Sequence, residues 1–167
     1  YGEEINSVLG IFDSSDPNTN LIGYDNTNGN CIAFGNMPYY ETYKLTATSS
    51  DVYNFTTSGS ANEVINIYQN EFIPPATGCQ NWLGSNFSYS PIVISSSYSI
   101  SLTEGDLIEM VISGFNSNEI GSFNINFSSN GTGALINADI LPTGFVYKYV
   151  IYNSSGSIIG IEDEADL

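Results

Sequence analysis

The titratable side chains of this chain are almost all carboxylates. Its 167 residues include 18 acidic side chains, two lysines (Lys44 and Lys148), no arginine and no histidine. Without histidine no Ser-His or Cys-His nucleophile pair can form, and two cations could do little to stabilise an oxyanion. A pair of carboxylates could still hydrolyse a glycosidic bond, although such sites usually come on larger scaffolds with several hydrogen-bond donors. We therefore expect a protein that is not an enzyme.

The two cysteines, Cys31 and Cys79, lie 48 residues apart. In an oxidising compartment their simplest chemistry is one disulfide, which would stabilise the fold by about 3–4 kcal/mol on the chain-entropy estimate. The alternative is a pair of buried free thiols. A metal site built on these two residues is not expected, because the chain has no histidine and no CxxC spacing.

The carboxylates raise the question of calcium, which prefers oxygen ligands. Asp25 opens a polar loop that runs to Cys31, and Glu162, Asp163 and Glu164 form an acidic run near the C-terminus. The loop lacks the Asp at position 1 and Glu at position 12 of a helix-loop-helix calcium site. The expectation is therefore a looser calcium site on these four residues. The alternative is that the acidity serves solubility alone.

Aromatic and amide side chains could bind carbohydrate. The chain has 12 tyrosines, one tryptophan and many asparagines, which offer flat rings for sugar faces and partners for hydroxyl groups. Tyr39, Tyr40 and Trp82 are the aromatics that strand alternation explains least, so we predict that they bind a ligand. The alternative is that they fill the core, as most aromatic residues in strands do.

Asparagine also occurs in five N-x-Ser/Thr sequons, which could carry glycans if the protein is made by a cell that glycosylates its surface proteins. Chance matches are frequent in a chain this rich in Asn, Ser and Thr. The five asparagines are Asn54, Asn86, Asn126, Asn130 and Asn153.

The overall charge of the chain limits the classes of partner that it is expected to bind. A formal net charge of −16 repels phosphate backbones and anionic lipid headgroups, so neither nucleic acid nor a membrane surface is an expected partner. No apolar run reaches 18 residues, so membrane insertion is not expected either. Mutual repulsion would also oppose self-association at neutral pH, and salt, acid or divalent ions would relieve it.

The segments that must position these side chains are short and alternate in polarity, as strands do. In the run 123–127, Phe123, Ile125 and Phe127 would line one face of a strand and the asparagines between them the other. The length is sufficient for a two-sheet core. We predict one all-β domain over 1–167, an antiparallel, jelly-roll-like β-sandwich. Its central unit is 41–128, with strand extensions over 1–40 and 130–167.

Two connection patterns lead to finer predictions. The strands 43–48 and 52–57 flank Ser49-Ser50-Asp51, which is typical of a hairpin. One pattern occurs three times: an aliphatic-aromatic pair ends one strand, and after a loop two apolar residues and a glycine begin the next. This pattern favours a shared hairpin device. The three copies begin at Ile11, Ile67 and Ile151, and their loops lead into Leu21-Ile22-Gly23, Trp82-Leu83-Gly84 and Ile158-Ile159-Gly160.

The order of these segments resembles the bacterial pre-peptidase C-terminal type of β-sandwich. The resemblance covers about half the chain. It rests on the strands 43–57 and 64–68, the Pro/Cys loop before Trp82-Leu83-Gly84, the turn 103–106 and the strand 121–127. It implies a non-catalytic accessory part of a secreted protein or cell-surface adhesin. Family members often carry an acidic calcium loop where this chain has Gly84-Ser85-Asn86-Phe87, which has no carboxylate.

Taken together, the sequence favours a non-catalytic structural or adhesive protein at the cell surface or secreted from the cell. The preferred mechanism is assembly of copies into a fibre or surface array by strand addition. The added strand would be either the run 145–152 or the N-terminal segment that contains Ile5, Val8, Leu9, Ile11 and Phe12. The alternative is a calcium-assisted module that binds a surface glycan. A third possibility, a passive spacer within an adhesin, predicts neither polymer nor ligand.

Overall fold

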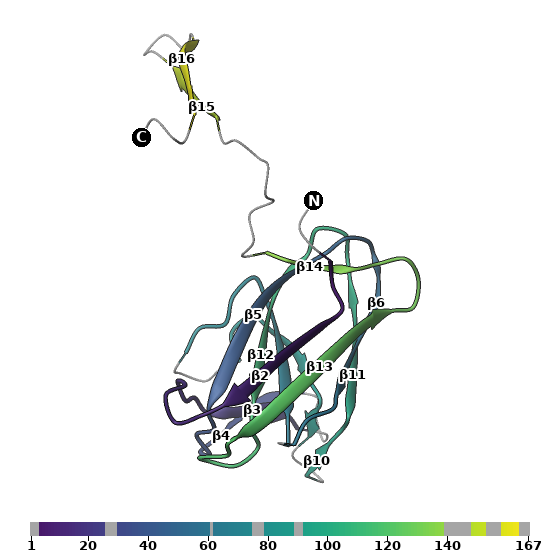
Figure 1. Cartoon of the computed structure of the whole chain (residues 1–167). Coiled ribbons are helices and arrows are strands. Elements are labelled where there is room, and N and C mark those ends of the chain that lie inside the picture. The colour runs from purple at the N-terminus through teal and green to yellow at the C-terminus, as the bar shows by residue number, and fades with distance from the viewer. Residues whose placement is uncertain are drawn as a thin grey trace.

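A computed structural model describes most of the chain, and every regular element in the described part is a β-strand (Figure 1). This confirms the predicted all-β, antiparallel sandwich. No described helix is long and apolar enough to cross a membrane. The described residues are 4–25, 30–60, 62–74, 79–88, 92–138, 148–152 and 158–163.

Three sheets build the body of the protein, and we call them the large, the facing and the flanking sheet. The large sheet has the order β1 (Glu4–Ile5), β14 (Leu135–Asn137), β5 (Tyr40–Ala47), β12 (Leu107–Ser113), β7 (Val64–Gln69), β8 (Trp82–Ser85). The facing sheet has the order β11 (Ser97–Leu102), β6 (Asp51–Thr57), β13 (Gly121–Ser129), β2 (Ser7–Phe12). The flanking sheet has the order β10 (Val93–Ile94), β9 (Phe87–Ser88), β3 (Leu21–Tyr24), β4 (Cys31–Phe34).

The main core lies between the large and facing sheets and follows from strand alternation. Phe123 and Ile125 of β13 are buried, and Phe127 packs against the same core, as the period-2 pattern predicted. Across from them, Ile108, Met110 and Ile112 of β12 are fully buried. Strands from both predicted extensions belong to this sandwich, because β2 completes the facing sheet and β1 and β14 extend the large sheet.

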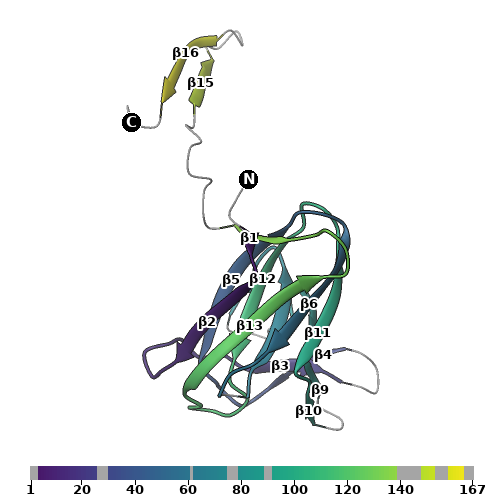
Figure 2. The same ribbon diagram turned by 45° about the vertical axis from the view of Figure 1, so that its right-hand side comes forward.

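Consecutive strands mostly change sheet, and this corrects the hairpin prediction. β5 lies in the large sheet and β6 in the facing sheet, so the turn between them crosses from one sheet to the other (Figure 2). Both strands have an apolar face, and the crossing turns the two faces toward each other, whereas a hairpin would set them side by side. The Tyr53 hydroxyl donates to the Ser49 carbonyl at 2.9 Å and holds the crossing. Gly105, in the turn that crosses from β11 to β12, has the expected positive φ of 86°.

The threefold pattern that favoured a shared hairpin device holds for two of its copies. β7 pairs with β8, and β15 (Lys148–Tyr152) pairs with β16 (Ile158–Asp163), both antiparallel. The first copy is not a hairpin, because β2 belongs to the facing sheet and β3 to the flanking sheet. The same local pattern therefore serves two different connections, and the partners of each strand decide which one forms.

A second apolar cluster covers the outer face of the large sheet. Tyr40, Tyr68, Phe72 and Val111 are buried there, and Trp82 packs against them. The buried Glu109 accepts a 2.7 Å hydrogen bond from the backbone N–H of Phe72 and so fixes the segment after β7 over the sheet. The flanking sheet packs beside this cluster, where Leu21, Val64 and Phe87 meet.

One buried carboxylate should make stability depend on pH. Glu63 is 5% exposed, and its Oε1 has no hydrogen-bond partner. Burial raises the pKa of Glu63; its own backbone N–H opposes this shift, and the Glu119 charge adds to it. Because the folded state favours the protonated form, stability falls as pH rises above the unfolded-state pKa of about 4.3 and through the raised folded value. We expect Glu63→Gln to unfold at higher urea than the wild type at pH 7 and at the same urea at pH 3. Equal midpoints at pH 7 would contradict this.

Candidate functional site

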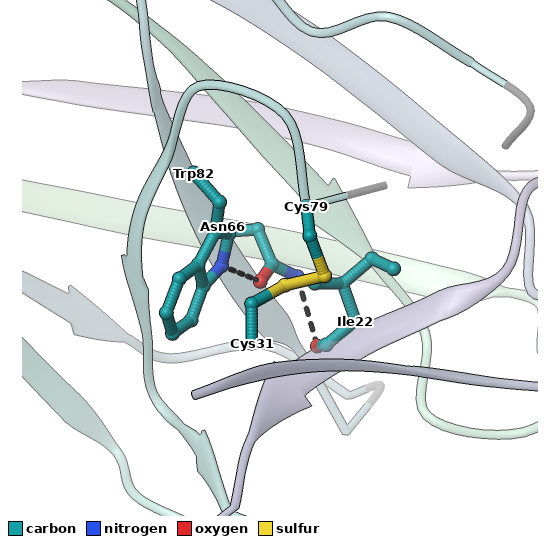
Figure 3. Close-up of a disulfide and its surroundings, with 5 residues drawn as sticks. All are labelled: Ile22, Cys31, Asn66, Cys79 and Trp82. Carbon is teal, nitrogen blue, oxygen red and sulfur yellow. Dashed lines mark hydrogen bonds between the residues drawn. A yellow bond between two sulfur atoms is a disulfide. The ribbon is translucent and has the colours of Figure 1, made fainter. Parts of the chain in front are cut away.

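The two cysteines form the predicted disulfide. Cys31 and Cys79 are joined with an S–S distance of 2.07 Å and a Cα–Cα distance of 5.7 Å (Figure 3). Cys31 begins β4 directly opposite Tyr24 of β3, and the Cys79 carbonyl accepts a hydrogen bond from the Trp82 backbone N–H. The bond therefore ties the strand pair that carries Tyr24 to the segment that leads into Trp82.

A buried asparagine fixes the orientation of the Trp82 ring beside this disulfide. Asn66 of β7 is 2% exposed, and its Oδ1 accepts a 3.0 Å hydrogen bond from Trp82 Nε1 (Figure 3). Its Nδ2 donates to the Ile22 carbonyl at 3.2 Å, which links β7 to β3. With its N–H satisfied and one side packed on the outer apolar cluster, the half-buried indole is held in place without a ligand.

A groove of about 420 Å³ lies between the ends of β8 and β11, and we call it the aromatic groove. The residues that line it are Tyr24, Trp82, Leu83, Gly84, Ser85, Asn86, Ser95, Ser97, Tyr98 and Ser99. The three aromatic side chains are half-buried, and Ser95, Ser97 and Ser99 are exposed. None of the lining residues carries a charge, although the chain as a whole has a net charge of −16.

Tyr98 of β11 lines the aromatic groove where the facing sheet approaches Gly84 of the large sheet. Its hydroxyl lies so close to Gly84 that a Cβ at this position would overlap it, so the glycine is required for the close approach. Burial raises the pKa of Tyr98, and the nearby Tyr24 phenol adds to the shift. The phenol is therefore protonated at neutral pH and can donate a hydrogen bond.

Asn86 holds the two walls of the groove together. It lies between β8 and β9, where the chain passes from the large sheet to the flanking sheet, and it is 4% exposed. Its Oδ1 accepts from the Ile65 backbone N–H at 2.8 Å, and its Nδ2 donates to the carbonyls of Glu63 at 3.1 Å and Ser95 at 2.8 Å. The last of these bonds fastens the segment before β11 to the end of β8.

The predicted ligand-binding set is only partly brought together. Trp82 lines the aromatic groove, but Tyr39 and Tyr40 do not. They point to opposite sides of the large sheet, Tyr39 against the main core and Tyr40 into the outer cluster, where it is 9% exposed. Tyr24 and Tyr98 were missed. Strand alternation over 97–102 assigns Tyr98 to the inward face with Ile100 and Leu102, so no signal in the sequence marked it as a groove residue.

The residues predicted to hold calcium lie in separate parts of the chain, and one of them is outside the described residues. Asp25 follows β3, Glu162 and Asp163 end β16, and Glu164 lies outside the described residues. Within the described part of the chain, no group of three or more His, Cys, Asp or Glu side chains could hold a metal ion. Calcium binding stays a prediction from the sequence.

The sequon asparagines fall into three groups. Asn54, Asn126 and Asn130 lie on or beside the outer face of the facing sheet, where Asn54 Nδ2 donates to Asn130 Oδ1 at 2.9 Å. Asn86 cannot carry a glycan in this fold, because its buried Nδ2 already donates two hydrogen bonds. Asn153 lies outside the described residues.

The N-terminal segment predicted to assemble copies lies in the chain's own sandwich. Ile5 is in β1, and Val8, Leu9, Ile11 and Phe12 are in β2, which pairs antiparallel with β13. Val8 and Phe12 are buried in the main core, whereas Leu9 and Ile11 face outward. Of the other proposed strand, 145–152, the part 148–152 forms β15 and the rest lies outside the described residues.

No protein-family model matches this chain, and no curated protein matches it. One similar solved structure is PliG of Aeromonas hydrophila, a periplasmic inhibitor of g-type lysozyme. It is 13% identical and has a TM-score of 0.44, and the match covers 75% of this chain and 87% of that chain. Another is the top component of cowpea mosaic virus, naturally occurring empty particles. It is 10% identical and has a TM-score of 0.33, with 82% and 87% covered. Likeness at this level supports no inference about function, and the resemblance to pre-peptidase C-terminal modules stays a prediction.

Proposed function

We propose that this protein is a non-catalytic, exported binding module that holds a neutral saccharide in the aromatic groove. The observation that carries the proposal is the lining of that groove. Tyr24, Trp82 and Tyr98 line it with flat, partly apolar rings, and the other lining residues are uncharged, with Ser95 exposed among them. A pyranose has apolar faces and a rim of hydroxyl groups, so rings and hydroxyl partners match its two kinds of surface.

The absence of charge in the groove favours a neutral ligand. A chain with a net charge of −16 would repel uronic acids and sulfated sugars at long range, and no lining residue could pair with their anionic groups. A cationic ligand would find no carboxylate among the lining residues to pair with. A neutral, hydroxyl-rich molecule is the class of ligand that would bind in the aromatic groove at the smallest electrostatic cost.

Two further observations support export and a non-catalytic role. The disulfide is of the kind that forms and persists in oxidising compartments. Among the described residues that line the groove there is no carboxylate, histidine or cysteine, the side chains that most often act as general acid, general base or nucleophile. A saccharide-binding module outside the cell would serve adhesion, in keeping with the adhesive role that the sequence favours.

The proposal can be tested on a glycan array, followed by calorimetry and by the emission of Trp82, the single tryptophan of the chain. We expect binding to neutral oligosaccharides and none to oligomers of uronic acids. Tyr24→Ala should weaken binding about tenfold, the loss of one stacking ring.

Tyr39→Ala is the matched control, because it removes a half-buried tyrosine that lies outside the groove. Its affinity should equal that of the wild type. An array without any neutral ligand, or equal losses in the two variants, would contradict the proposed function.

A further inference from the structure

A second pocket, of about 380 Å³, lies where the outer apolar cluster meets the start of β5. Its lining combines two aromatic rings with three carboxylates, and we call it the carboxylate pocket. These five residues are Tyr40, Phe72, Asp16, Glu41 and Glu109. Among the described residues, none lines both this pocket and the aromatic groove, whose lining is uncharged. The carboxylate pocket is therefore a separate site and suits a different class of ligand.

Glu109 of β12 is the lining residue that most needs a partner. It is only 7% exposed, and acidic side chains this deeply buried are usually paired with a cation. Its Oε2 accepts the backbone N–H of Phe72 at 2.7 Å. In the described part of the chain its Oε1 accepts no hydrogen bond, yet this oxygen is not among the unpaired atoms that are sealed from solvent. Oε1 therefore opens into the carboxylate pocket, where a bound molecule can donate to it.

The other two carboxylates of the pocket are held in place in the same way. The Tyr43 hydroxyl donates to Glu41 Oε2 at 2.8 Å, and the Asp13 backbone N–H donates to Asp16 Oδ2 at 2.8 Å. Both carboxylates are half-buried, and they come from β5 and from the loop between β2 and β3. Each therefore has one oxygen fixed by the protein, and the pocket gathers negative charge from three separate segments.

Tyr40 and Phe72 give the pocket an apolar wall. Their rings meet edge to face, with centroids 5.5 Å apart and an interplanar angle of 82°, and both side chains are more than nine-tenths buried. Burial raises the pKa of Tyr40, and the Glu109 charge adds to the shift, so the phenol stays protonated at neutral pH. The accessible parts of these rings can contact the methylene groups of a ligand and attract its cationic end.

From these features we infer that the carboxylate pocket binds a primary alkylammonium group, carried by a small amine or by a lysine side chain. Such a group combines a positive charge and three N–H donors with a chain of methylene groups, which matches the carboxylates and the aromatic wall. Because Glu109 presents a single open oxygen, it suits an ammonium donor better than the two-pronged guanidinium group. A quaternary ammonium group fits less well, since it has no N–H to donate.

A metal ion fits the pocket less well than an organic cation. In the described ranges, no group of three or more His, Cys, Asp or Glu side chains could hold a metal ion, so the three carboxylates do not converge on one point. An ammonium group needs only one close carboxylate and gains from the others through their charge. The net charge of −16 also attracts cations to the protein from a distance.

Calorimetric titration of the full chain with n-butylammonium tests the inference. At about 0.05 M NaCl we expect a dissociation constant on the order of 1 mM, and much weaker binding of tetramethylammonium and of neutral butan-1-ol. Glu109→Gln keeps an acceptor for the Phe72 N–H but removes the charge, and it should weaken binding about tenfold.

Glu104→Gln is the matched control, because Glu104 is exposed outside the pocket and the substitution removes the same charge. Its affinity for n-butylammonium should stay within about twofold of the wild type. Equal losses in the two variants would mean diffuse attraction to an acidic surface and would overturn the inference. So would equal affinities for n-butylammonium and tetramethylammonium.

Lys44 offers a variant with the opposite sign. It lies opposite Glu109 in the register of β5 and β12, on the same face of the sheet, but it does not line the pocket. Its charge therefore opposes a bound cation, and Lys44→Met should tighten n-butylammonium binding about threefold. A variant that only damaged the fold would weaken binding, so the two signs separate a binding site from a folding defect. Unchanged or weaker binding by Lys44→Met would contradict the inference.

Two further ligands identify the source of the ammonium group. Nα-acetyl-lysine amide presents it as a lysine side chain of a partner protein would, and 1,4-diaminobutane presents it as a free amine. The tighter binder of the two assigns the source, and binding of neither would overturn the inference. Tyr24→Ala should leave both affinities unchanged, because Tyr24 lines the aromatic groove and not this pocket. Failure of ammonium binding and failure of saccharide binding are therefore distinguishable.

Discussion

Replacing Asn86 with alanine should lower the free energy of unfolding by about 3–5 kcal/mol, because it leaves several buried groups without partners. The substitution removes the acceptor of the Ile65 N–H and the donor to the Glu63 and Ser95 carbonyls. No backbone group takes over these bonds, since Asn86 lies where the chain leaves one sheet and enters another. The cost is that of desolvated, unpaired backbone groups in addition to the lost hydrogen bonds.

Urea unfolding followed by the emission of Trp82 measures this loss. Asn130→Ala is a suitable control, because Asn130 is exposed and its Oδ1 accepts one bond from Asn54. We expect the control to stay within about 1 kcal/mol of the wild type. A similar small loss for Asn86→Ala would mean that the amide is not the link between the sheets. The Ser95 bond also positions the β11 wall, so saccharide affinity should fall in the same variant.

Removing the disulfide should also lower the free energy of unfolding substantially. The Cys31→Ser/Cys79→Ser variant should lose about 3–4 kcal/mol of unfolding free energy, because the bond closes a loop of 48 residues in the unfolded chain. A reductant should lower the unfolding midpoint of the wild type and leave that of the variant unchanged. If the reductant lowered both midpoints equally, its effect on the wild type would not come from this bond.

The same variant should weaken binding of a neutral oligosaccharide even where it remains folded. The disulfide fixes the distance between the strand pair that carries Tyr24 and the segment that leads into Trp82. Without it, two ring-bearing walls of the aromatic groove must be ordered when the ligand binds, which costs conformational entropy. Calorimetry at a temperature well below the unfolding transition separates this effect from the loss of stability. An unchanged affinity would show that the other contacts suffice to hold the groove.

The Asn86 and disulfide predictions concern the same set of links around the aromatic groove. Asn86 links the end of β8 to the segment before β11, and the disulfide links the segment before β8 to β4. Asn66 completes the arrangement by binding both Trp82 and the Ile22 carbonyl. The aromatic groove is thus bounded by three sheets that are joined at polar contacts and one covalent bond, which favours a preformed site.

Local patterns determined several features from the sequence alone. Alternation over 123–127 predicted which side chains of β13 enter the core, and the structure buries Phe123 and Ile125. The turn with Gly105 was recognisable because few other residues adopt a positive φ. Composition was enough to propose a chain without histidine-based catalysis, and two cysteines allowed a single intramolecular pairing, which the structure contains.

Only the tertiary structure decided which strands become neighbours, and the site depends on that choice. A turn such as Ser49-Ser50 serves equally well within a sheet or between sheets, so the sequence could not show that β5 and β6 face each other. Tyr39 and Tyr40 are adjacent in the chain yet point to opposite faces, whereas Tyr24, Trp82 and Tyr98 converge from three different sheets. Strand alternation acts over two residues, while strand pairing and sheet packing act over the whole chain. The sequence therefore predicted the kind of residue a site would use, and long-range packing selected which of those residues meet.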